Sequence, residues 1–235
     1  GAFAQVNTEV FDGFRFIGSL RYDKNQNYEG RVTPRIAAVY TFSETHNLRF
    51  SYQTGFRNPD TQSQFIFFPT GTSTLLGTAR ANAERYGVME GNAWTNASYQ
   101  AYLLSGGTLD PATGDPTGGN AALLKEAYVD YVKPERLASF EFGYKGVIGD
   151  VLLVDMNYYN TNYEDFEGGQ NVNAKYASSH KGQAIPAGYT WALNSNTDDE
   201  VKSWGFGMGL TVDLGMGYKL TGNYNYKNLE IDGAD

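Results

Sequence analysis

Hydrophobic and polar residues alternate strictly through the segment 47–56. One face would carry Leu48, Phe50, Tyr52, Thr54 and Phe56, and the other would carry Asn47, Arg49, Ser51, Gln53 and Gly55. A period of two residues indicates a β-strand whose two faces meet different surroundings. About ten residues is also the length that a tilted strand needs to cross a bilayer. The segment therefore predicts a strand that spans a membrane.

The same alternation recurs about eight times along the chain. The predicted strands are residues 2–10, 14–23, 32–42, 47–56, 137–147, 151–161, 203–213 and 217–226. One face is apolar, as at Phe206, Met208 and Leu210, and the other is polar or small, as at Asn223 and Asn225. The glycine repeat from Gly205 to Gly209 belongs to such a strand and would leave room on its polar face. It is not a phosphate-binding loop, because no helix follows it.

The connections between these strands alternate in length. Tight turns are predicted at 11–13, 43–46, 148–150 and 214–216, whereas long connections run over 24–31, 57–136 and 162–202. Outer-membrane barrels have short periplasmic turns at one end and longer extracellular loops at the other. A soluble β-sandwich also alternates but has no reason to sort its connections in this way. The pattern therefore favours an all-β, antiparallel transmembrane barrel.

Composition narrows the choice of class. The mean hydropathy is −0.46 and no run approaches the roughly 18 apolar residues of a membrane helix, so membrane-spanning helices are excluded. Aromatic residues make up 15% of the chain, which suits the aromatic girdles of a barrel.

The absence of cysteine excludes disulfides and thiolate sites, and two histidines are too few for a histidine metal cluster. A net charge of −8 argues against a nucleic-acid partner. We expect no metal and no cofactor.

Several motifs resemble those of the TonB-dependent outer-membrane receptors. Arg21-Tyr-Asp23 ends one predicted strand, Thr33-Pro-Arg-Ile36 opens the next, and Leu48-Arg-Phe-Ser-Tyr-Gln-Thr-Gly-Phe-Arg-Asn-Pro59 follows. Val132-Lys-Pro-Glu-Arg-Leu-Ala-Ser-Phe-Glu-Phe-Gly-Tyr-Lys-Gly146 and the strand that ends at Asn157-Tyr-Tyr-Asn-Thr-Asn-Tyr-Glu-Asp-Phe166 are similar to later motifs of that family. The matches occur in the family's order across most of the chain. Such a series is far more specific than any one motif.

The resemblance implies a plugged barrel of about twenty-two strands in the outer membrane of a Gram-negative bacterium. Such a receptor imports a scarce hydrophilic ligand, an oligosaccharide, a peptide or a siderophore, with energy from the inner membrane. Its partners would be outer-membrane lipid, the plug domain of the same parent protein and TonB. A SusC-like member would add a surface lipoprotein. Residues 1–235 would then form part of one barrel domain, with the plug and the remaining strands outside this chain.

Three alternatives stay open at this point. An autonomous barrel of about eight strands could close with side chains filling its interior. A receptor-like barrel could also serve as a structural subunit of a larger envelope complex. A third reading, a soluble carbohydrate-binding β-domain, would fold without detergent. The opening segment 1–5 has neither the basic region nor the apolar core of a signal peptide, so we expect a mature start or an internal piece.

Candidate ligand-binding residues lie where the predicted strands meet the long connections. Arg57 leaves the fourth strand and could bind a ligand carboxylate, or pair with carboxylates of the rim or plug. Trp94, Tyr99 and Tyr102 lie in the first long connection and Trp191 in the second. Aromatic rings stack on sugars and planar ligands. The alternative is that these rings pack the connections onto themselves.

Other polar groups are weaker candidates. The segment 109–115 holds Asp110 and Asp115, which could bind calcium, but such a stretch is more often a solvated turn. The carboxylates Glu164-Asp165 and Asp198-Asp-Glu200 are adjacent rather than opposed across a cleft, so we expect no glycosidase and no enzyme. Short helices are predicted at 79–86 and 121–128.

Overall fold

The computed structural model describes residues 1–197 and 199–232, which fold as two compact units. The sheet unit comprises Gly1–Arg57, Arg136–Glu164 and the described part of Asp198–Asp235. The loop unit comprises Asn58–Glu135 and Asp165–Thr197. Asp198, which belongs to one of the predicted carboxylate runs, lies outside the described residues.

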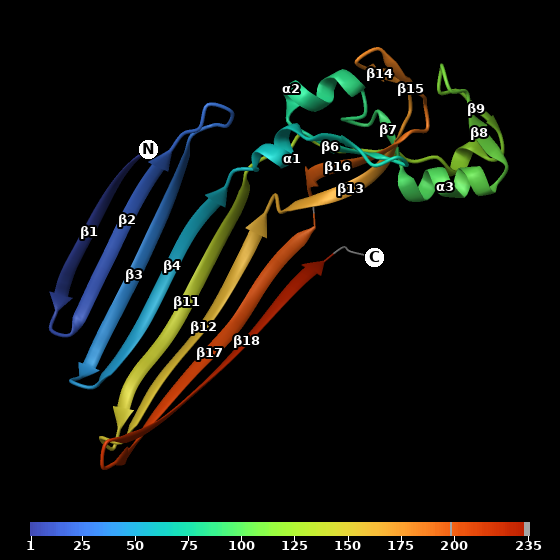
Figure 1. The fold of residues 1–235 in the computed structure, drawn as a ribbon. Helices are drawn as coiled ribbons and strands as arrows, with labels where there is room; N and C mark the ends of the chain where they lie inside the picture. Colours follow the sequence, from blue (N-terminus) through green and yellow to red (C-terminus); the bar gives the residue numbers. More distant parts are fainter. Residues whose placement is uncertain (198, 233–235) are drawn as a thin grey trace. The chain divides into compact units, whose positions relative to one another are not determined.

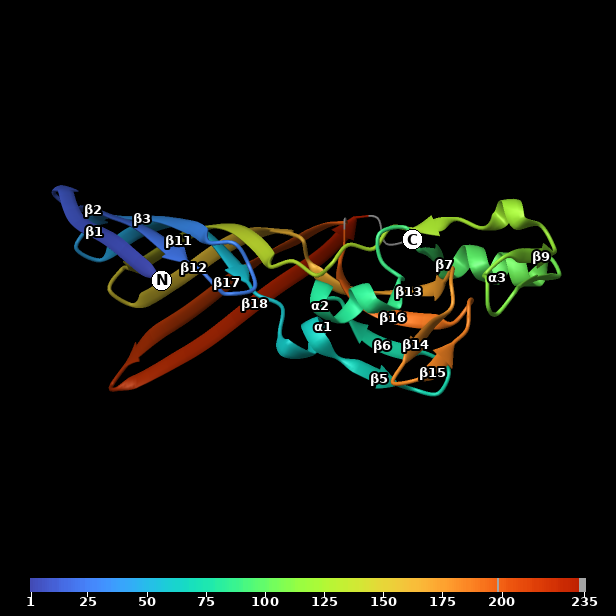
Figure 2. The same ribbon diagram turned by 90° about the horizontal axis from the view of Figure 1, so that it is seen from above.

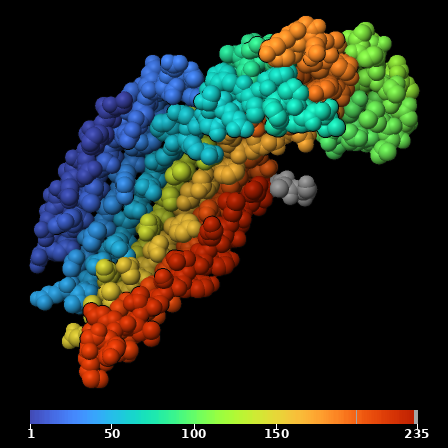
Figure 3. Space-filling view, viewed as in Figure 1, coloured from blue at the N-terminus to red at the C-terminus, as the bar shows by residue number. Residues whose placement is uncertain are grey.

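The sheet unit is a single eight-stranded meander with the order β1-β2-β3-β4-β11-β12-β17-β18 (Figure 1). Its strands are β1 (Ala2–Phe11), β2 (Phe14–Asp23), β3 (Arg31–Ser43), β4 (His46–Arg57), β11 (Glu135–Ile148), β12 (Leu152–Glu164), β17 (Glu200–Gly215) and β18 (Tyr218–Asp232). The strands lie side by side in chain order from blue to red in Figure 3, and Figure 2 shows the strong twist of the sheet. All eight strands predicted from the alternation are confirmed.

The register keeps the two faces apart across the sheet. Phe142 lies opposite Tyr158, Tyr158 opposite Phe206, and Phe206 opposite Tyr226, so apolar side chains meet apolar side chains over four strands. Because side chains alternate along a strand, the residues between them form the polar face. Many large side chains of the apolar face are exposed, for instance Phe142 at 48%.

Aromatic rings are in contact along the turn end of the sheet's apolar face. Their centroids are 4.8 Å apart for Phe11 and Phe14, 5.6 Å for Phe42 and His46, and 6.0 Å for His46 and Tyr144. Tyr40 joins the first pair to Phe42. Rings gathered at one level across neighbouring strands are typical of the aromatic girdle of a membrane barrel.

The sheet is open among the described residues. β1 pairs with β2 and β18 pairs with β17, and these two outer strands are the edges of the sheet order. The structure therefore does not show the closed eight-strand barrel that the sequence left as an alternative.

The loop unit is built from most of the two longest connections, residues 57–136 and 162–202. Its six-stranded sheet has the order β10-β7-β13-β16-β6-β5, in which β7 pairs with β13 across the two connections and β16 pairs with β6 in parallel. The strands are β5 (Phe67–Pro69), β6 (Thr74–Gly77), β7 (Ala93–Thr95), β10 (Glu126–Ala127), β13 (Glu167–Ala174) and β16 (Thr190–Asn196), with the hairpins β8 (Gly107–Leu109) to β9 (Pro116–Gly118) and β14 (Ser178–His180) to β15 (Gln183–Ile185).

Short helices cover this smaller sheet. They are α1 (Thr61–Phe65), α2 (Arg80–Ala83), α3 (Asn96–Leu104) and the 3₁₀ turns η1 (Glu84–Tyr86) and η2 (Ala121–Leu123). The predicted helix at 79–86 is confirmed by α2 and η1. The one predicted at 121–128 is wrong beyond Leu123, because Glu126 and Ala127 pair as β10 with β7. None of the described helices is long and apolar enough to cross a membrane.

The loop unit has a hydrophobic core of its own. Trp191, Leu76 and Val172 are completely buried, and His180 stacks on Phe67 with ring centroids 3.7 Å apart. The hydroxyl of Tyr86 and Nδ1 of His180 are 2.7 Å apart. Both long connections are thus folded structure rather than plain links.

Candidate functional site on the polar face and in the loop unit

A trough with a glycine floor crosses the polar face of the sheet unit. Gly207 of β17 lies between Asn157 of β12 and Asn225 of β18. A Cβ atom on Gly207 would lie 2.5 Å from Oδ1 of Asn157 and 2.8 Å from Oδ1 of Asn225. Both amides therefore lean over the floor, and only glycine leaves room for them. The space beside Gly207 is thus taken up by the two amides, whereas the nearest atom to a Cβ on Gly209 would be 3.8 Å away.

The trough offers hydrogen-bonding groups of several kinds. It is a cavity of about 450 Å³ lined by Arg49, Glu141, Asp155, Asn157, Gly207, Met208, Gly209, Asn223 and Asn225. Three amides, two carboxylates and one guanidinium surround it, with Met208 as the only large apolar residue of the set. Such a lining suits contact with a hydrophilic solute or with polar polypeptide rather than with lipid.

One ion pair bridges the strands of the trough wall. Arg49 of β4 donates from Nη2 to Oδ1 of Asp155 on β12. It passes over Gly143, where a Cβ would lie 3.2 Å from Nε of Arg49. Both partners are about two-fifths exposed, so the pair adds little stability but holds a cation at a fixed place in the wall.

The polar face of β2 and β3 is basic. Arg15 lies opposite Val39 on β3, and Arg35 lies four residues from Val39 along the same strand. Neither arginine has an ion-pair partner within the ranges that the structure describes. A cationic wall on an overall acidic chain favours an anionic neighbour at this place.

The structure puts two of the predicted ligand-binding rings in the interior of the loop unit. Trp191 has no exposed surface and belongs to the core. Tyr102 is equally buried, and its hydroxyl donates to the carbonyl oxygens of Thr108 at 2.8 Å and Thr117 at 3.0 Å. Neither ring is accessible to a ligand in this structure. Both rings instead pack the long connections onto themselves.

Trp94 belongs to a half-exposed cluster. The ammonium of Lys175 lies 4.5 Å from the centre of the Trp94 ring and 2.5 Å from Oε1 of Glu126, whose Oε2 accepts a hydrogen bond from Tyr128 at 3.0 Å. The Lys175 and Tyr128 hydrogen bonds lower the pKa of Glu126, and that carboxylate raises the pKa of Tyr128. Sequence reasoning missed this cluster, because Lys175 lies 49 positions from Glu126 along the chain.

The remaining predicted residues do not gather around this cluster. Tyr99 is partly buried on α3, and its burial raises the pKa of the phenol. Its hydroxyl lies so close to Gly188 that a Cβ there would be 2.2 Å away. Arg57 is exposed at the end of β4 in the sheet unit. The site predictions for Arg57, Trp94 and Tyr99 stay predictions.

The Asp110 turn is held by its own backbone. Oδ1 of Asp110 accepts hydrogen bonds from the amides of Thr113 at 2.9 Å and Ala112 at 2.8 Å, which lower the pKa of this carboxyl. Asp115 accepts from the hydroxyl of Thr113. Across residues 1–197 and 199–232, no group of three or more His, Asp or Glu side chains could hold a metal ion.

The chain matches one known protein family, and its fold is similar to several solved structures. The family model for "TonB dependent receptor-like, beta-barrel" matches residues 1–235. The siderophore receptor PirA from Pseudomonas aeruginosa is 15% identical, with a TM-score of 0.57 over 98% of this chain and 34% of that chain. A mutant of the ferric enterobactin receptor PfeA from the same organism, in complex with enterobactin, is 16% identical with a TM-score of 0.60, over 96% and 26%.

The FrpB iron transporter from Neisseria meningitidis is 11% identical with a TM-score of 0.52, over 97% of this chain and 25% of that chain. At these identities the likeness shows the fold alone. This chain spans about a third or less of the length of these structures. No curated protein matches it.

Proposed function

The chain belongs to the TonB-dependent receptor-like β-barrel family, and from this premise we propose that it serves the uptake of an iron chelate across the outer membrane. Members of this family are outer-membrane transport proteins of Gram-negative bacteria. They are receptors and transporters rather than enzymes. The sheet unit accordingly contributes eight strands to an outer-membrane barrel.

One observation carries the proposal. The eight strands keep one apolar and one polar face in register, and both long connections lie at the same end of the sheet and fold into one unit with its own core. In a barrel of this class the apolar face contacts lipid, the polar face lines the lumen, and the long connections lie outside the cell. The glycine trough and the arginines Arg15 and Arg35 would then line the lumen.

The choice of an iron chelate rests on two supports. The structures that this fold is similar to include receptors named for siderophores and for ferric enterobactin. The basic polar face of β2 and β3 suits a ligand with negative charge. An oligosaccharide or a peptide would need only the amides of the glycine trough and would make no use of the arginines.

The mechanism that follows has three steps. The loop unit captures the chelate outside the cell, with Trp94 and the neighbouring Lys175, Glu126 and Tyr128 as candidate contacts. The plug domain of the parent protein rearranges when TonB pulls on it from the periplasm. The chelate then passes along the polar face. No described feature of this chain argues for the surface lipoprotein of a SusC-like receptor.

Topology is tested in the full-length parent protein after any cysteine outside this chain has been changed to serine; residues 1–235 contain none. Thr113→Cys in the exposed turn of the loop unit should react with a membrane-impermeant maleimide in intact cells. Glu44→Cys in the short turn between β3 and β4 is the matched control and should react only after lysis. The reverse pattern would contradict the assignment of outside and inside.

Uptake is tested with radioactive iron bound to enterobactin in cells that have the parent protein as their only such receptor. Uptake should require the parent protein and should stop when an uncoupler collapses the inner-membrane potential. A neutral ferric hydroxamate and a labelled oligosaccharide are the comparison ligands. Energy-dependent uptake of the oligosaccharide without uptake of either chelate would contradict the proposal.

A further inference from the structure

The apolar face of the sheet unit turns polar near the loop end of β12, β17 and β18. Its last apolar row consists of Tyr158, Phe206 and Tyr226, which lie opposite one another. Residues two and four positions further along each strand lie on the same face. They form the outer polar patch, which comprises Asn160, Asn162, Lys202, Trp204, Asn228 and Glu230. The strands continue unbroken here, so the change lies in what surrounds this end of the sheet.

The patch begins where the apolar stretch of β17 ends. The side chains of that stretch that belong to the apolar face are Phe206, Met208, Leu210, Val212 and Leu214. Its length matches the about 9 to 11 residues that a tilted strand needs to cross a bilayer. Because β17 has 16 residues, positions 200–205 extend beyond the hydrocarbon on the side of the second long connection.

One carboxylate of the patch is held in place and keeps a free oxygen. Oε1 of Glu230 accepts hydrogen bonds from Nε1 of Trp204 at 3.0 Å and from Nδ2 of Asn228 at 2.7 Å. Within residues 1–197 and 199–232, Oε2 of Glu230 has no hydrogen-bond or ion-pair partner. The half-buried Trp204 ring packs on Tyr226, with ring centroids 5.4 Å apart. The patch thus offers a fixed acceptor beside an aromatic ring.

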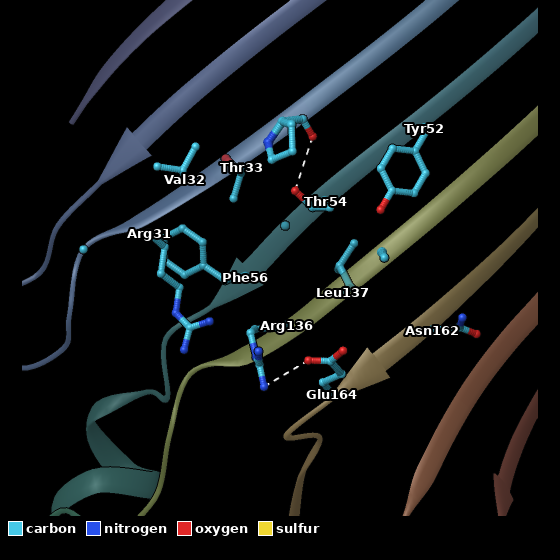
Figure 4. A pocket seen from close by; sticks show the side chains of 14 residues that line it. Arg31, Val32, Thr33, Tyr52, Thr54, Phe56, Arg136, Leu137, Asn162 and Glu164 are labelled. Atoms are coloured by element: carbon cyan, nitrogen blue, oxygen red, sulfur yellow. Dashed lines mark hydrogen bonds and ion pairs between the residues drawn. The ribbon is translucent and has the colours of Figure 1, made fainter.

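Two amides on β12 add further polar groups. The side chains of Asn160 and Asn162 make no hydrogen bond to any part of the chain that the structure describes. Asn162 is exposed and borders a cavity of about 600 Å³ that Thr54 and Ala138 also line (Figure 4). Each amide can donate and accept, which suits a ligand that carries hydroxyl groups.

The cations near the patch are already engaged. Nζ of Lys202 lies 2.8 Å from Oε1 of Glu200. Figure 4 shows the ion pair between Arg136 and Glu164 at the loop end of the cavity, where Nη2 and Oε2 are 2.9 Å apart. Neither cation is free for a phosphate, which Glu230 would also repel. The polar groups therefore favour an uncharged ligand over an anionic one.

We propose that the outer polar patch binds the uncharged sugar headgroup of an outer-leaflet glycolipid. A sugar ring can stack its C–H face on Trp204 and donate its hydroxyls to carboxylate and amide oxygens. Asn162 and Glu230 are two strand spacings apart, about 10 Å, which leaves room for a sugar ring between them. The apolar residues of the same face contact the acyl chains, so the headgroup attached to those chains meets the patch. The inference shares with the proposed function only the outward orientation of the long connections.

Glycolipid binding is tested on the full-length parent protein in a mild detergent by native mass spectrometry. The probe is diglucosyl diacylglycerol, and the comparison lipids are diacylglycerol and phosphatidylethanolamine with the same acyl chains. The parent protein should retain the glycolipid about tenfold more strongly than either, because only its headgroup brings sugar hydroxyls to Glu230 and the two asparagines. Equal retention of the three lipids would overturn the proposal.

The source of the sugar is tested with the free disaccharide of the same headgroup. Added at the same concentration as the glycolipid, the disaccharide should leave the glycolipid bound, because it lacks the acyl chains that contact the apolar face. Displacement of the glycolipid at equal concentration would overturn the assignment to a lipid and make a soluble glycan the ligand.

Paired variants locate the site. Trp204→Leu should reduce glycolipid retention about tenfold, whereas Phe206→Leu, on the same face but within the hydrocarbon, should not. Trp204→Phe keeps an aromatic face and should retain more glycolipid than Trp204→Leu. Equal retention by Trp204→Leu and Phe206→Leu would overturn the proposal.

A second pair tests the acceptor. Glu230→Gln should weaken glycolipid retention about tenfold, because it replaces a charged acceptor by a neutral amide. Glu141→Gln, on the polar face of the same sheet, is the matched control. Equal retention by these two variants would also overturn the proposal. Iron uptake is measured separately, so its failure would leave this result intact.

Discussion

The sheet unit and the loop unit are both β-structures, yet they place their large apolar side chains in opposite ways. The sheet unit leaves Phe142 and Leu220 48% and 63% exposed. The loop unit buries Trp191 and Tyr102 completely. A protein in water hides such groups, because burial of apolar surface drives its folding. The difference teaches that one chain meets two solvents, lipid at the sheet and water at the loops.

The largest expected effect concerns a tryptophan in each unit. Trp191→Ala should destabilise the loop unit by about 3 to 5 kcal/mol, because it leaves a cavity in a closed core. Trp204→Ala on β17 should cost less, since its ring packs on Tyr226 at one side of the sheet and leaves no closed cavity. Hydrogen exchange of the parent protein, read at β6 and β16 and at β17, measures both. A larger loss of stability for Trp204→Ala than for Trp191→Ala would contradict the difference between the two units.

A smaller effect is expected at two glycines of the sheet unit. Gly207→Val should cost about 1 to 3 kcal/mol, because its side chain would collide with Asn157 and Asn225. Gly222→Val, on the apolar face of β18 with open space around its Cβ position, should be tolerated. Unfolding midpoints of the two variants in detergent measure the difference. Equal midpoints would mean that the trough is not closely packed.

The smallest effect is a pH dependence in the loop unit. The pKa of Asp110 is lowered by the amides of Thr113 and Ala112, so its contribution to the turn is complete above the unfolded pKa and is lost as the pH falls through the folded pKa. Protection of residues 110–115 from hydrogen exchange, corrected for intrinsic rates, should fall in acid. Asp110→Asn, which does not titrate, is the control and should show no such fall.

The sequence predicts the sheet unit well and the loop unit poorly, for a physical reason. Strands of 10 to 16 residues whose two faces meet different surroundings must alternate apolar and polar residues along their whole length. The strands β4 and β17 can therefore be recognised in the sequence. The strands of the loop unit are 2 to 8 residues long, and β7 and β13 pair across two separate connections. No periodicity within either segment indicates that the two strands pair.

The candidate site was harder to predict than the fold. Aromatic residues in long connections suggested ligand contacts, but the same residue types build a core, as Trp191 and Tyr102 do. The ion pair of Lys175 with Glu126 joins residues 49 positions apart, which spacing along the chain does not show. Only the glycine repeat of β17 could be assigned a place in advance, because alternation fixes the face to which each glycine belongs.

The assignment of lipid to the apolar face is tested most directly by two neighbouring positions on β17. Leu210 belongs to the apolar face, and Thr211 belongs to the polar face, where its hydroxyl lies 3.1 Å from that of Thr221. In the parent protein refolded into lipid vesicles, Leu210→Arg should cost about 2 to 4 kcal/mol if it lies near the bilayer midplane, and Thr211→Arg should cost much less. Equal penalties, or a larger one for Thr211→Arg, would contradict the account.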